Sequence, residues 1–331
     1  MKWDEKMDGA PEASGKHGSG DVTIGLLHPG EMGAAVGQCL VGQGYAVLWT
    51  PEGRSAATAA RAEAAGLTAA GGLADLVGRA DIIISVCPPH AALDVAGQVA
   101  GAARHGAGYG RQRARSSGPD AGWGGPDAGW GGRHGAGSDG IFVDANAISP
   151  ATARNVAAIV EAGGAAYVDG GIIGAPPVAP GHTRLYLSGP RAGEVRRLFE
   201  GTALDARLVG RDAPVGAASA VKLAYAAWTK GTAALVLAAR GLARAEGVED
   251  VLLAEWALSQ PGLDERSARA ARSAAAKGWR WIAEMEEIAA AMAAAGLPEG
   301  FHEAAAEIYR RSPDGGDGSL DAILTALLSS P

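Results

Sequence analysis

The sequence predicts an α/β fold, in which a doubly wound parallel sheet is followed by an all-helical C-terminal domain. Short apolar strand patterns alternate with amphipathic helix patterns in the first part of the chain, and beyond Val215 only helix patterns occur. At 331 residues the chain is long enough for two domains with separate cores. We expect these domains at 21–212 and 213–329, with a disordered tail at 1–20 and a glycine-rich, disordered insert at 104–139.

The first strand leads into a glycine-punctuated turn and a helix. Residues 22–33 read VTIGLLHPGEMG. A helix that begins at the end of a buried strand directs free N–H groups and its positive dipole end at the turn, as a dinucleotide pyrophosphate requires. Because His28 stands where the fingerprint has its first glycine, ordinary strand–turn–helix packing stays an alternative. The candidate cofactor-binding residues of this turn are His28, Pro29, Gly30, Glu31, Met32 and Gly33.

The second strand, 46–50, lies about twenty residues beyond the turn, where dinucleotide-binding folds contact the adenosine ribose. Thr50, Arg54 and Ser55 stand at or just after its end, and an arginine with hydroxyl groups suits a 2′-phosphate. The sequence therefore favours NADP over NAD as the cofactor. Glu52 keeps NAD open, because a carboxylate there binds the ribose hydroxyls, and the alternative role of Arg54 is a solvated charge that opens the next helix.

The rest of the first part continues the same alternation. A strand at 81–87 is apolar apart from Asp81 and Ser85, as expected of a strand buried on both faces of a parallel sheet. We expect further elements in the order helix 91–103, strand 141–146, helix 149–161, strands 166–169 and 183–188, and helix 192–200. Within 104–139 the segment GPDAGWG occurs twice, which is typical of an expanded surface loop.

One long helix dominates the second part of the chain. The segment 216–246 is mostly apolar, and we expect shorter helices at 251–258, 265–277, 279–295, 299–310 and 320–328. The long helix carries more apolar surface than one small helical domain covers, which predicts a homodimer.

Composition excludes several classes of partner. The net charge is −7 and no basic block follows the N-terminal tail, which argues against nucleic acid and anionic membrane surfaces as partners. No apolar run is long and uncharged enough to span a bilayer. The two cysteines, Cys39 and Cys87, lack metal-ligand spacing, so we expect no metal, reduced thiols and a cytoplasmic location.

Lysine is scarce, and this singles out one position. After Lys16 the only lysines are Lys222, Lys230 and Lys277, and Lys222 lies in the most apolar part of the long helix. Burial lowers the pKa of an ammonium group toward the range in which it exchanges protons, as hydride transfer to or from a carbonyl requires. The alternative is a lysine whose ammonium group reaches the surface along a packed helix.

Lys222 also belongs to a polar stripe on that helix. Ser219, Lys222, Tyr225 and Thr229 repeat at helical spacing among Ala, Leu and Val. We therefore name Lys222 as the candidate general acid/base and Tyr225 as a group that orients the substrate. Asn146, at the carboxyl end of a strand, has the same candidate role, and its alternative is to start the next turn.

Together these motifs resemble the 6-phosphogluconate dehydrogenase and β-hydroxyacid dehydrogenase superfamily. The similarity is strongest to its branch of phosphogluconate-dehydrogenase-like NAD(P)-binding proteins with a poorly characterised C-terminal helical domain. The segments that carry the resemblance are 25–33, 85–89, 144–150, 216–222 and 300–309. The resemblance implies a Rossmann-type cofactor domain, a catalytic role for Lys222, and cofactor contacts from Cys87 and Pro88 at the end of the fourth strand.

The sequence departs from the family pattern around the substrate. The family's Ser-Gly-Gly loop falls at 173–175 without its serine, and its asparagine falls at Ala226. Tyr225 stands where phosphogluconate enzymes carry a histidine, and Glu286–Glu287 stands where β-hydroxyacid enzymes carry a lysine–aspartate pair. These departures suggest a different or less anionic substrate. The retained lysine favours alcohol or carbonyl chemistry over imine reduction.

The sequence therefore predicts an NADP-dependent oxidoreductase that interconverts a hydroxy acid-like alcohol and a carbonyl, with a small-molecule substrate bound between the two domains. An NADPH-dependent imine reductase is the alternative among enzymes. A non-catalytic NADP-binding sensor or structural protein is the alternative outside them, because His28 replaces a motif glycine and family substrate groups are missing.

Overall fold

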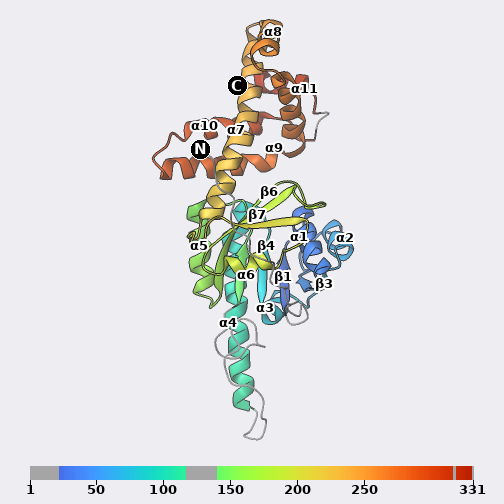
Figure 1. The fold of residues 1–331 in the computed structure, drawn as a ribbon, viewed down its shortest axis with the longest axis vertical. Coiled ribbons are helices and arrows are strands. Elements are labelled where there is room, and N and C mark those ends of the chain that lie inside the picture. The colour runs from blue at the N-terminus through green and yellow to red at the C-terminus, as the bar shows by residue number, and fades with distance from the viewer. Residues whose placement is uncertain (1–21, 117–139, 316–317, 330–331) are drawn as a thin grey trace, which may run out of the picture.

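The computed structural model describes residues 22–116, 140–315 and 318–329. An eight-stranded sheet has the order β3-β2-β1-β4-β5-β6-β7-β8, in which neighbouring strands are parallel except β6 and β7. A helical region follows it in the chain and lies on one side of it (Figure 1). The predicted fold class is confirmed. The predicted tail at 1–20 and most of the predicted insert, 117–139, lie outside the described residues, and the domain boundaries stay predictions.

The elements have the following bounds. The strands are β1 (Thr23–Leu27), β2 (Ala46–Trp49), β3 (Thr68–Ala69), β4 (Ile82–Ser85), β5 (Ile141–Asp144), β6 (Ala166–Ile173), β7 (Thr183–Ser188) and β8 (Leu204–Leu208). The helices around the sheet are α1 (Glu31–Gly42), α2 (Ala56–Ala64), α3 (Leu73–Arg79), the 3₁₀ turn η1 (Pro89–Ala91), α4 (Ala92–Ser116), α5 (Pro150–Glu161) and α6 (Ala192–Arg197). The helices of the helical region are α7 (Ala217–Ala245), α8 (Glu249–Ser259), α9 (Leu263–Ala294), α10 (Gly300–Arg311) and α11 (Leu320–Ser329).

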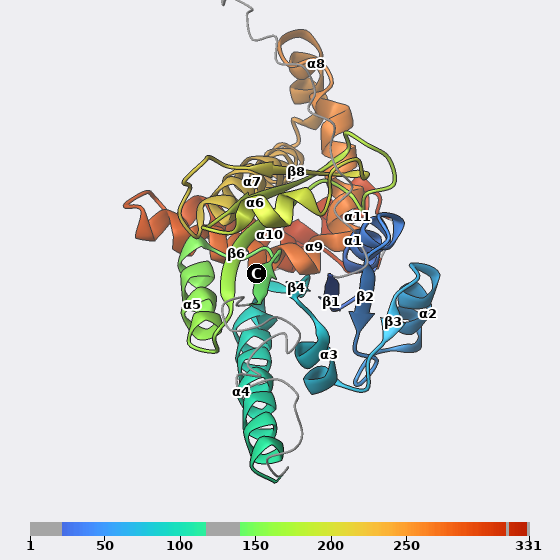
Figure 2. The same cartoon turned by 60° about the horizontal axis from the view of Figure 1, so that its bottom comes forward.

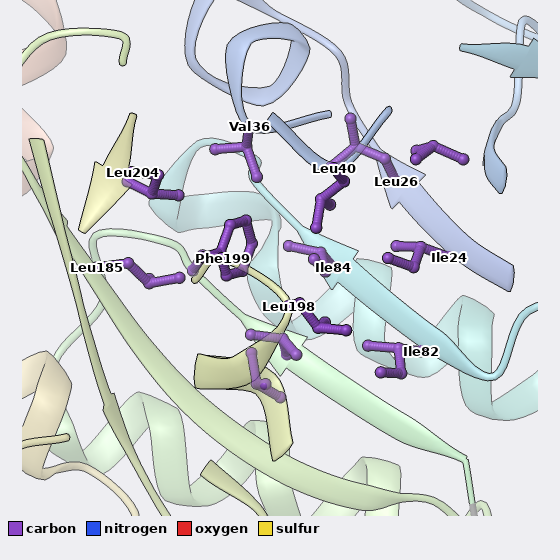
Figure 3. Close-up of a cluster of buried hydrophobic side chains, with 14 of the residues drawn as sticks. Ile24, Leu26, Val36, Leu40, Ile82, Ile84, Leu185, Leu198, Phe199 and Leu204 are labelled. Atoms are coloured by element: carbon purple, nitrogen blue, oxygen red, sulfur yellow. The ribbon is translucent and has the colours of Figure 1, made fainter. Parts of the chain in front are cut away.

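Helices cover both faces of the sheet. One face packs against α1, α2 and α6 in a core that contains Leu40 and Phe199 (Figure 3). The other face packs against α3, α4 and α5. Side chains alternate along a strand, so Ile82 and Ile84 of β4 enter the first core while Ile83 enters the second. This double burial explains the run of three isoleucines, 82–84, in β4.

The N-terminus of α7 is anchored on β6. The buried Asp169 carboxylate accepts hydrogen bonds from the backbone N–H groups of Gly216 (3.0 Å) and Ser219 (3.0 Å) and from the Ser219 hydroxyl (2.6 Å). Gly171 allows the helix to approach the strand, because a Cβ at this position would lie 2.7 Å from the carbonyl oxygen of Ala218. The first turns of α7 are therefore fixed against β6.

The helical region has a core of its own. α7 extends from the sheet through this region (Figure 1), and α9, α10 and α11 pack against it. The buried side chains of this core include Leu237, Met285, Ile288, Tyr309 and Leu324. None of the helices in the described residues is long and apolar enough to cross a membrane.

The helix α9 is continuous, whereas the sequence predicts two helices that meet at Gly278. Gly278 is buried, and a Cβ at this position would lie 3.7 Å from the ring of Tyr309 on α10. Packing between α9 and α10 therefore outweighs the low helix propensity of glycine. Predicting two helices here was wrong.

Further elements also differ from the sequence prediction. α4 continues to Ser116 beyond the predicted end at 103, although the low helix propensity of Gly106, Gly108 and Gly110 disfavours a helix there. β3 is only two residues long, and β8 ends in exposed residues, so neither has an apolar pattern of useful length. Pairing with β2 and β7 defines these two strands instead.

Candidate active site

The turn between β1 and α1 has an unusual backbone conformation. His28 has a φ of 65°, in the left-handed region that favours glycine, and it is the one such non-glycine residue among those described. A Cβ at Gly33 would lie 2.4 Å from the carbonyl oxygen of His28, so the turn requires glycine there. Gly30, the N-cap of α1, faces open space. The turn thus leaves the N-terminal end of α1 accessible at the carboxyl edge of the sheet.

A cavity of about 230 Å³ lies at the carboxyl ends of β1 and β2. Its lining includes His28, Thr50, Glu52 and Arg54. The Nδ1 atom of His28 is buried and has no hydrogen-bond partner within the described part of the chain. Burial, together with the nearby positive charge of Arg54, lowers the pKa of His28 to about 4. The imidazole is therefore neutral at pH 7.

A second cavity, of about 390 Å³, lies at the carboxyl ends of β4 and β5, on the other side of the β1–α1 turn. The two cavities flank β1 and β4, where the strand order reverses, and open α/β sheets bind ligands at this point. The second cavity is lined by sheet-edge residues and by α7 and α9, namely Met32, Val86, Cys87, Ala145, Asn146, Ala147, Ile172, Ile173, Gly174, Lys222, Tyr225, Ala226, Thr229, Lys230, Lys277, Arg280, Trp281 and Glu284.

Lys222 lines this second cavity and is half-buried. Within the described residues its ammonium group makes no hydrogen bond or ion pair. Burial lowers the pKa of Lys222 to about 8, and the positive charge of Lys230 acts in the same direction. The negative charges of Glu284 and Asp144 oppose this shift. Lys222 thus changes its protonation state near neutral pH, as a proton donor and acceptor must.

Asn146 is held by the strand ends beside the cavity. Its side-chain Oδ1 accepts a hydrogen bond from the backbone N–H of Cys87 (2.5 Å), and its Nδ2 donates to the Ser85 hydroxyl (3.4 Å). The backbone N–H of Asn146 donates to Asp144 (2.9 Å). Burial, together with the neighbouring Asp169 carboxylate, raises the pKa of Asp144 to about 7, and the hydrogen bond from the backbone N–H of Asn146 opposes this shift. Asn146 is therefore a rigid group that joins β4 to β5.

The far wall of the second cavity comes from the helical region. Lys230 of α7 forms an ion pair with Glu284 of α9 and lies 5.4 Å from the centroid of the Trp281 ring. The helix α9 lies beside the sheet (Figure 1 and Figure 2) and contacts η1. Glu287 of α9 accepts a hydrogen bond from the backbone N–H of Ser149 (3.1 Å). These contacts hold α9 against the edge of the sheet, so that it forms one wall of the second cavity.

The structure brings most of the predicted site residues together in two groups. Lys222, Tyr225, Asn146, Met32 and Cys87 line the second cavity. The first cavity has His28, Thr50 and Arg54 in its lining, and Gly30 and Gly33 shape the turn between the two cavities, beside the buried Pro29.

Besides Pro29, Gly30 and Gly33 of the turn, three predicted residues, Glu31, Ser55 and Pro88, lie outside both linings. Glu31 is exposed in the first turn of α1, and Pro88 is exposed after β4. The Ser55 hydroxyl accepts a hydrogen bond from the backbone N–H of Thr58 (3.2 Å) and so caps α2. The predicted polar stripe on α7 is also incomplete, because Ser219 is buried and bonded to Asp169.

The sequence prediction missed several charged residues of the second cavity. Lys230, Lys277 and Arg280 line it, although only Lys222 was selected as a site residue. The scarcity of lysine applies equally to Lys230 and Lys277 and gives the same signal for them. Nothing comparable points to Arg280, because arginine is common throughout the chain. Among the described residues, no cluster of three or more histidine, cysteine or acidic side chains is suited to hold a metal ion.

Comparison with known proteins identifies the fold. Residues 243–312 match the family model described as a domain of unknown function, DUF1932. No curated protein matches the chain. The chain is similar to MTH1747, a solved protein of unknown function that is described as structurally similar to 3-hydroxyacid dehydrogenases. The chain and MTH1747 are 24% identical, with coverage of 92% of this chain and 99% of that chain and a TM-score of 0.61.

Two enzymes of known structure have the same architecture. The 3-hydroxyisobutyrate dehydrogenase of Mycobacterium tuberculosis, solved with L-serine, is 19% identical, with coverage of 92% of this chain and 99% of that chain and a TM-score of 0.62. This is the fold of the 3-hydroxyacid dehydrogenases. A variant imine reductase of Myxococcus stipitatus, solved with NAD⁺, is 22% identical, with coverage of 93% and 99% and a TM-score of 0.52. The resemblance to the β-hydroxyacid dehydrogenase superfamily is confirmed at the level of the fold.

Proposed function

We propose that this protein is an NADP-dependent oxidoreductase that interconverts a hydroxy acid-like alcohol and a carbonyl compound. The observation that carries the proposal is the placement of Lys222. Its ammonium group has a lowered pKa and no ion-pair partner within the described residues, and it lines a cavity that Met32 of the cofactor turn also borders. A 3-hydroxyacid dehydrogenase fold around such a lysine supports dehydrogenase chemistry.

The residues present fit a nicotinamide dinucleotide. Gly30 leaves open space at the N-terminus of α1, where backbone N–H groups suit the pyrophosphate. The exposed Arg54, with Thr50 and the orphaned Nδ1 of His28, lines the first cavity and suits an adenosine 2′-phosphate. We therefore propose NADP rather than NAD. Such a cofactor supplies a hydride to a carbonyl carbon and takes it back in the reverse direction.

Lys222 supplies the proton that balances the hydride. In reduction its ammonium group donates a proton to the carbonyl oxygen as the carbon gains the hydride, so that an alcohol forms. In oxidation the neutral amine takes the hydroxyl proton as the hydride leaves the carbon. Tyr225 is half-exposed at the cavity, and its hydroxyl makes no hydrogen bond within the described residues, so it is free to orient the substrate oxygen.

Reduction of an imine is the second candidate activity. The fold match to an imine reductase favours it, and the Lys222 ammonium group can protonate an imine nitrogen as well as a carbonyl oxygen. Two panels of compounds, carbonyls and imines, distinguish the two activities. A non-catalytic NADP-binding role predicts that NADPH binds and is oxidised by neither panel.

We further propose a homodimer that associates through α7. Trp228, Leu235 and Leu242 recur every seven residues on this helix and are 68%, 50% and 66% exposed. Their regular spacing produces one apolar stripe, which a second copy of the chain would bury. Light scattering should give twice the mass of the chain, and Leu242→Glu should give the single mass. The cytoplasmic location stays a prediction.

The test of the proposed function compares the wild type with Lys222→Met. Binding of NADPH is followed by its fluorescence, and its oxidation is screened against both panels. We expect both proteins to bind NADPH and only the wild type to oxidise it with a carbonyl compound. Equal turnover by the two proteins would contradict the role of Lys222, and a wild type that does not bind NADPH would contradict the cofactor.

A further inference from the structure

The second cavity has a charge opposite to that of the chain. The whole chain has a net charge of −7, yet this cavity is lined by four cationic side chains, Lys222, Lys230, Lys277 and Arg280, and by one carboxylate, Glu284. The part of the chain that the structure describes contains three lysines, and all three are among these residues. Lysines at random surface positions do not converge on one cavity.

The ion pairs of the cavity leave most of this positive charge unbalanced. Glu284 pairs with Lys230. Lys277 and Arg280 lie one turn apart on α9, and both are exposed. Neither makes an ion pair within the described residues, and the Arg280 guanidinium lies 4.9 Å from the centroid of the Trp279 ring, which holds it by a cation–π contact. Two cations thus face the cavity with no anionic partner.

The cofactor does not account for these charges. The groups suited to its phosphates are the N-terminus of α1 and Arg54, and neither Lys277 nor Arg280 lines the first cavity. Guanidinium and ammonium groups bind phosphate and carboxylate through charge-assisted hydrogen bonds. The partner that these side chains suit is therefore the substrate itself.

We propose, on the basis of the proposed function, that the substrate carries a phosphate or carboxylate group remote from its reacting carbon. Lys277 and Arg280 hold this anionic group, while Lys222 faces the reacting oxygen. The family substrate groups missing from 173–175 and Ala226 are thus replaced from another wall of the cavity, by α9. The substrate is thus anionic, whereas the sequence suggested a different or less anionic one.

The test uses pairs of compounds that differ in one anionic group. Dissociation constants are measured by calorimetry on the full chain, with and without NADP⁺, for dihydroxyacetone phosphate against dihydroxyacetone and for 2-oxoglutarate against 2-oxopentanoate. The variants are Lys277→Gln/Arg280→Gln and, as a matched control, Arg272→Gln. Arg272 is an exposed residue of the same helix and lies outside the cavity lining.

We expect the more anionic member of at least one pair to bind at least about tenfold more tightly, because Lys277 and Arg280 form charge-assisted hydrogen bonds with its additional anionic group. The double variant should lose this preference and Arg272→Gln should keep it. The pair that shows the preference identifies phosphate or carboxylate as the group. Equal binding within both pairs, no binding at all, or a preference that survives in the double variant would overturn the inference. Failure to bind NADP⁺ would instead contradict the proposed function. The two failures are distinguishable, because binding of the probes is also measured without NADP⁺.

Discussion

The two cavities beside the β1–α1 turn are built in different ways. The first is formed by the carboxyl ends of β1 and β2 and the segments that follow them, so its key residues, from His28 to Arg54, lie close together in the sequence. The second combines the edge of the sheet with α7 and α9, and residues as distant as Met32 and Glu284 line it. The polar residues of the first cavity come from the ends of two neighbouring strands, and residues of α3 and α4 complete its lining. The second cavity depends on how the helical region docks on the sheet.

The difference also concerns what holds each cavity in place. The first relies on a backbone turn in which His28 has a left-handed conformation. The second relies on Asp169, whose carboxylate fixes the start of α7, and on the contacts of α9 with the sheet edge. A change in one anchor should therefore alter one cavity and leave the other intact.

The largest expected effect comes from removing the amine of the second cavity. Lys222→Met should lower turnover by about 10²- to 10⁴-fold, the usual contribution of a general acid or base. The dissociation constant for NADPH should stay unchanged, because the groups suited to the cofactor phosphates lie in the turn and the first cavity. Steady-state kinetics and NADPH fluorescence measure the two quantities. A large loss of NADPH binding would show that the cavities are not separate.

The anchor of α7 should have the next largest effect. Asp169→Ala leaves the N–H groups of Gly216 and Ser219 and the hydroxyl of Ser188 without their buried acceptor. The free energy of unfolding should fall by about 3 kcal/mol, since each buried unsatisfied group costs about 1–3 kcal/mol. Urea denaturation measures it. Asp205→Ala, which removes a carboxylate paired with the exposed Arg207, is the control and should cost less than about 1 kcal/mol.

The smallest of the three effects concerns the first cavity. Arg54→Ala should weaken NADPH binding by about tenfold and leave NADH binding nearly unchanged, because only NADPH carries the 2′-phosphate. Turnover at saturating NADPH should not change, since Arg54 does not line the second cavity. Fluorescence titrations with both cofactors measure the ratio. Equal weakening of NADPH binding and NADH binding would show that Arg54 does not recognise the 2′-phosphate.

The same difference between the cavities explains which of their residues could be predicted from the sequence. Gly30, Gly33 and Arg54 were predictable because a strand, a turn and a helix fix their positions within about thirty residues. The position of Lys222 at a cavity was predictable from the sequence, because burying an ammonium group among apolar neighbours is costly and such a residue stands out in an apolar helix. Arg280 and Lys277 were not selected, because charged residues on a helix usually face solvent and no local pattern shows which side of α9 meets the sheet.

Some predictions were wrong because the structure at these positions depends on tertiary contacts, which the local sequence pattern does not show. Gly278 suggested a helix boundary, and the packing of Tyr309 against it keeps α9 continuous. Ser219 was assigned to the polar stripe of the long helix, yet its hydroxyl donates to Asp169, fifty residues earlier in the chain. In both cases the deciding partner lies on another element.

The proton-transfer role of Lys222 makes opposite predictions for the two directions of the reaction, and the pH dependence of turnover tests them. Lys222 has a pKa of about 8, so its ammonium form, which reduction requires, is lost as the pH rises through that value. Turnover for reduction should therefore fall above about pH 8, and turnover for oxidation should rise through the same range to a plateau. Both inflections should be absent from the residual activity of Lys222→Met. The same pH profile in both directions, or inflections that persist in Lys222→Met, would contradict the role of Lys222.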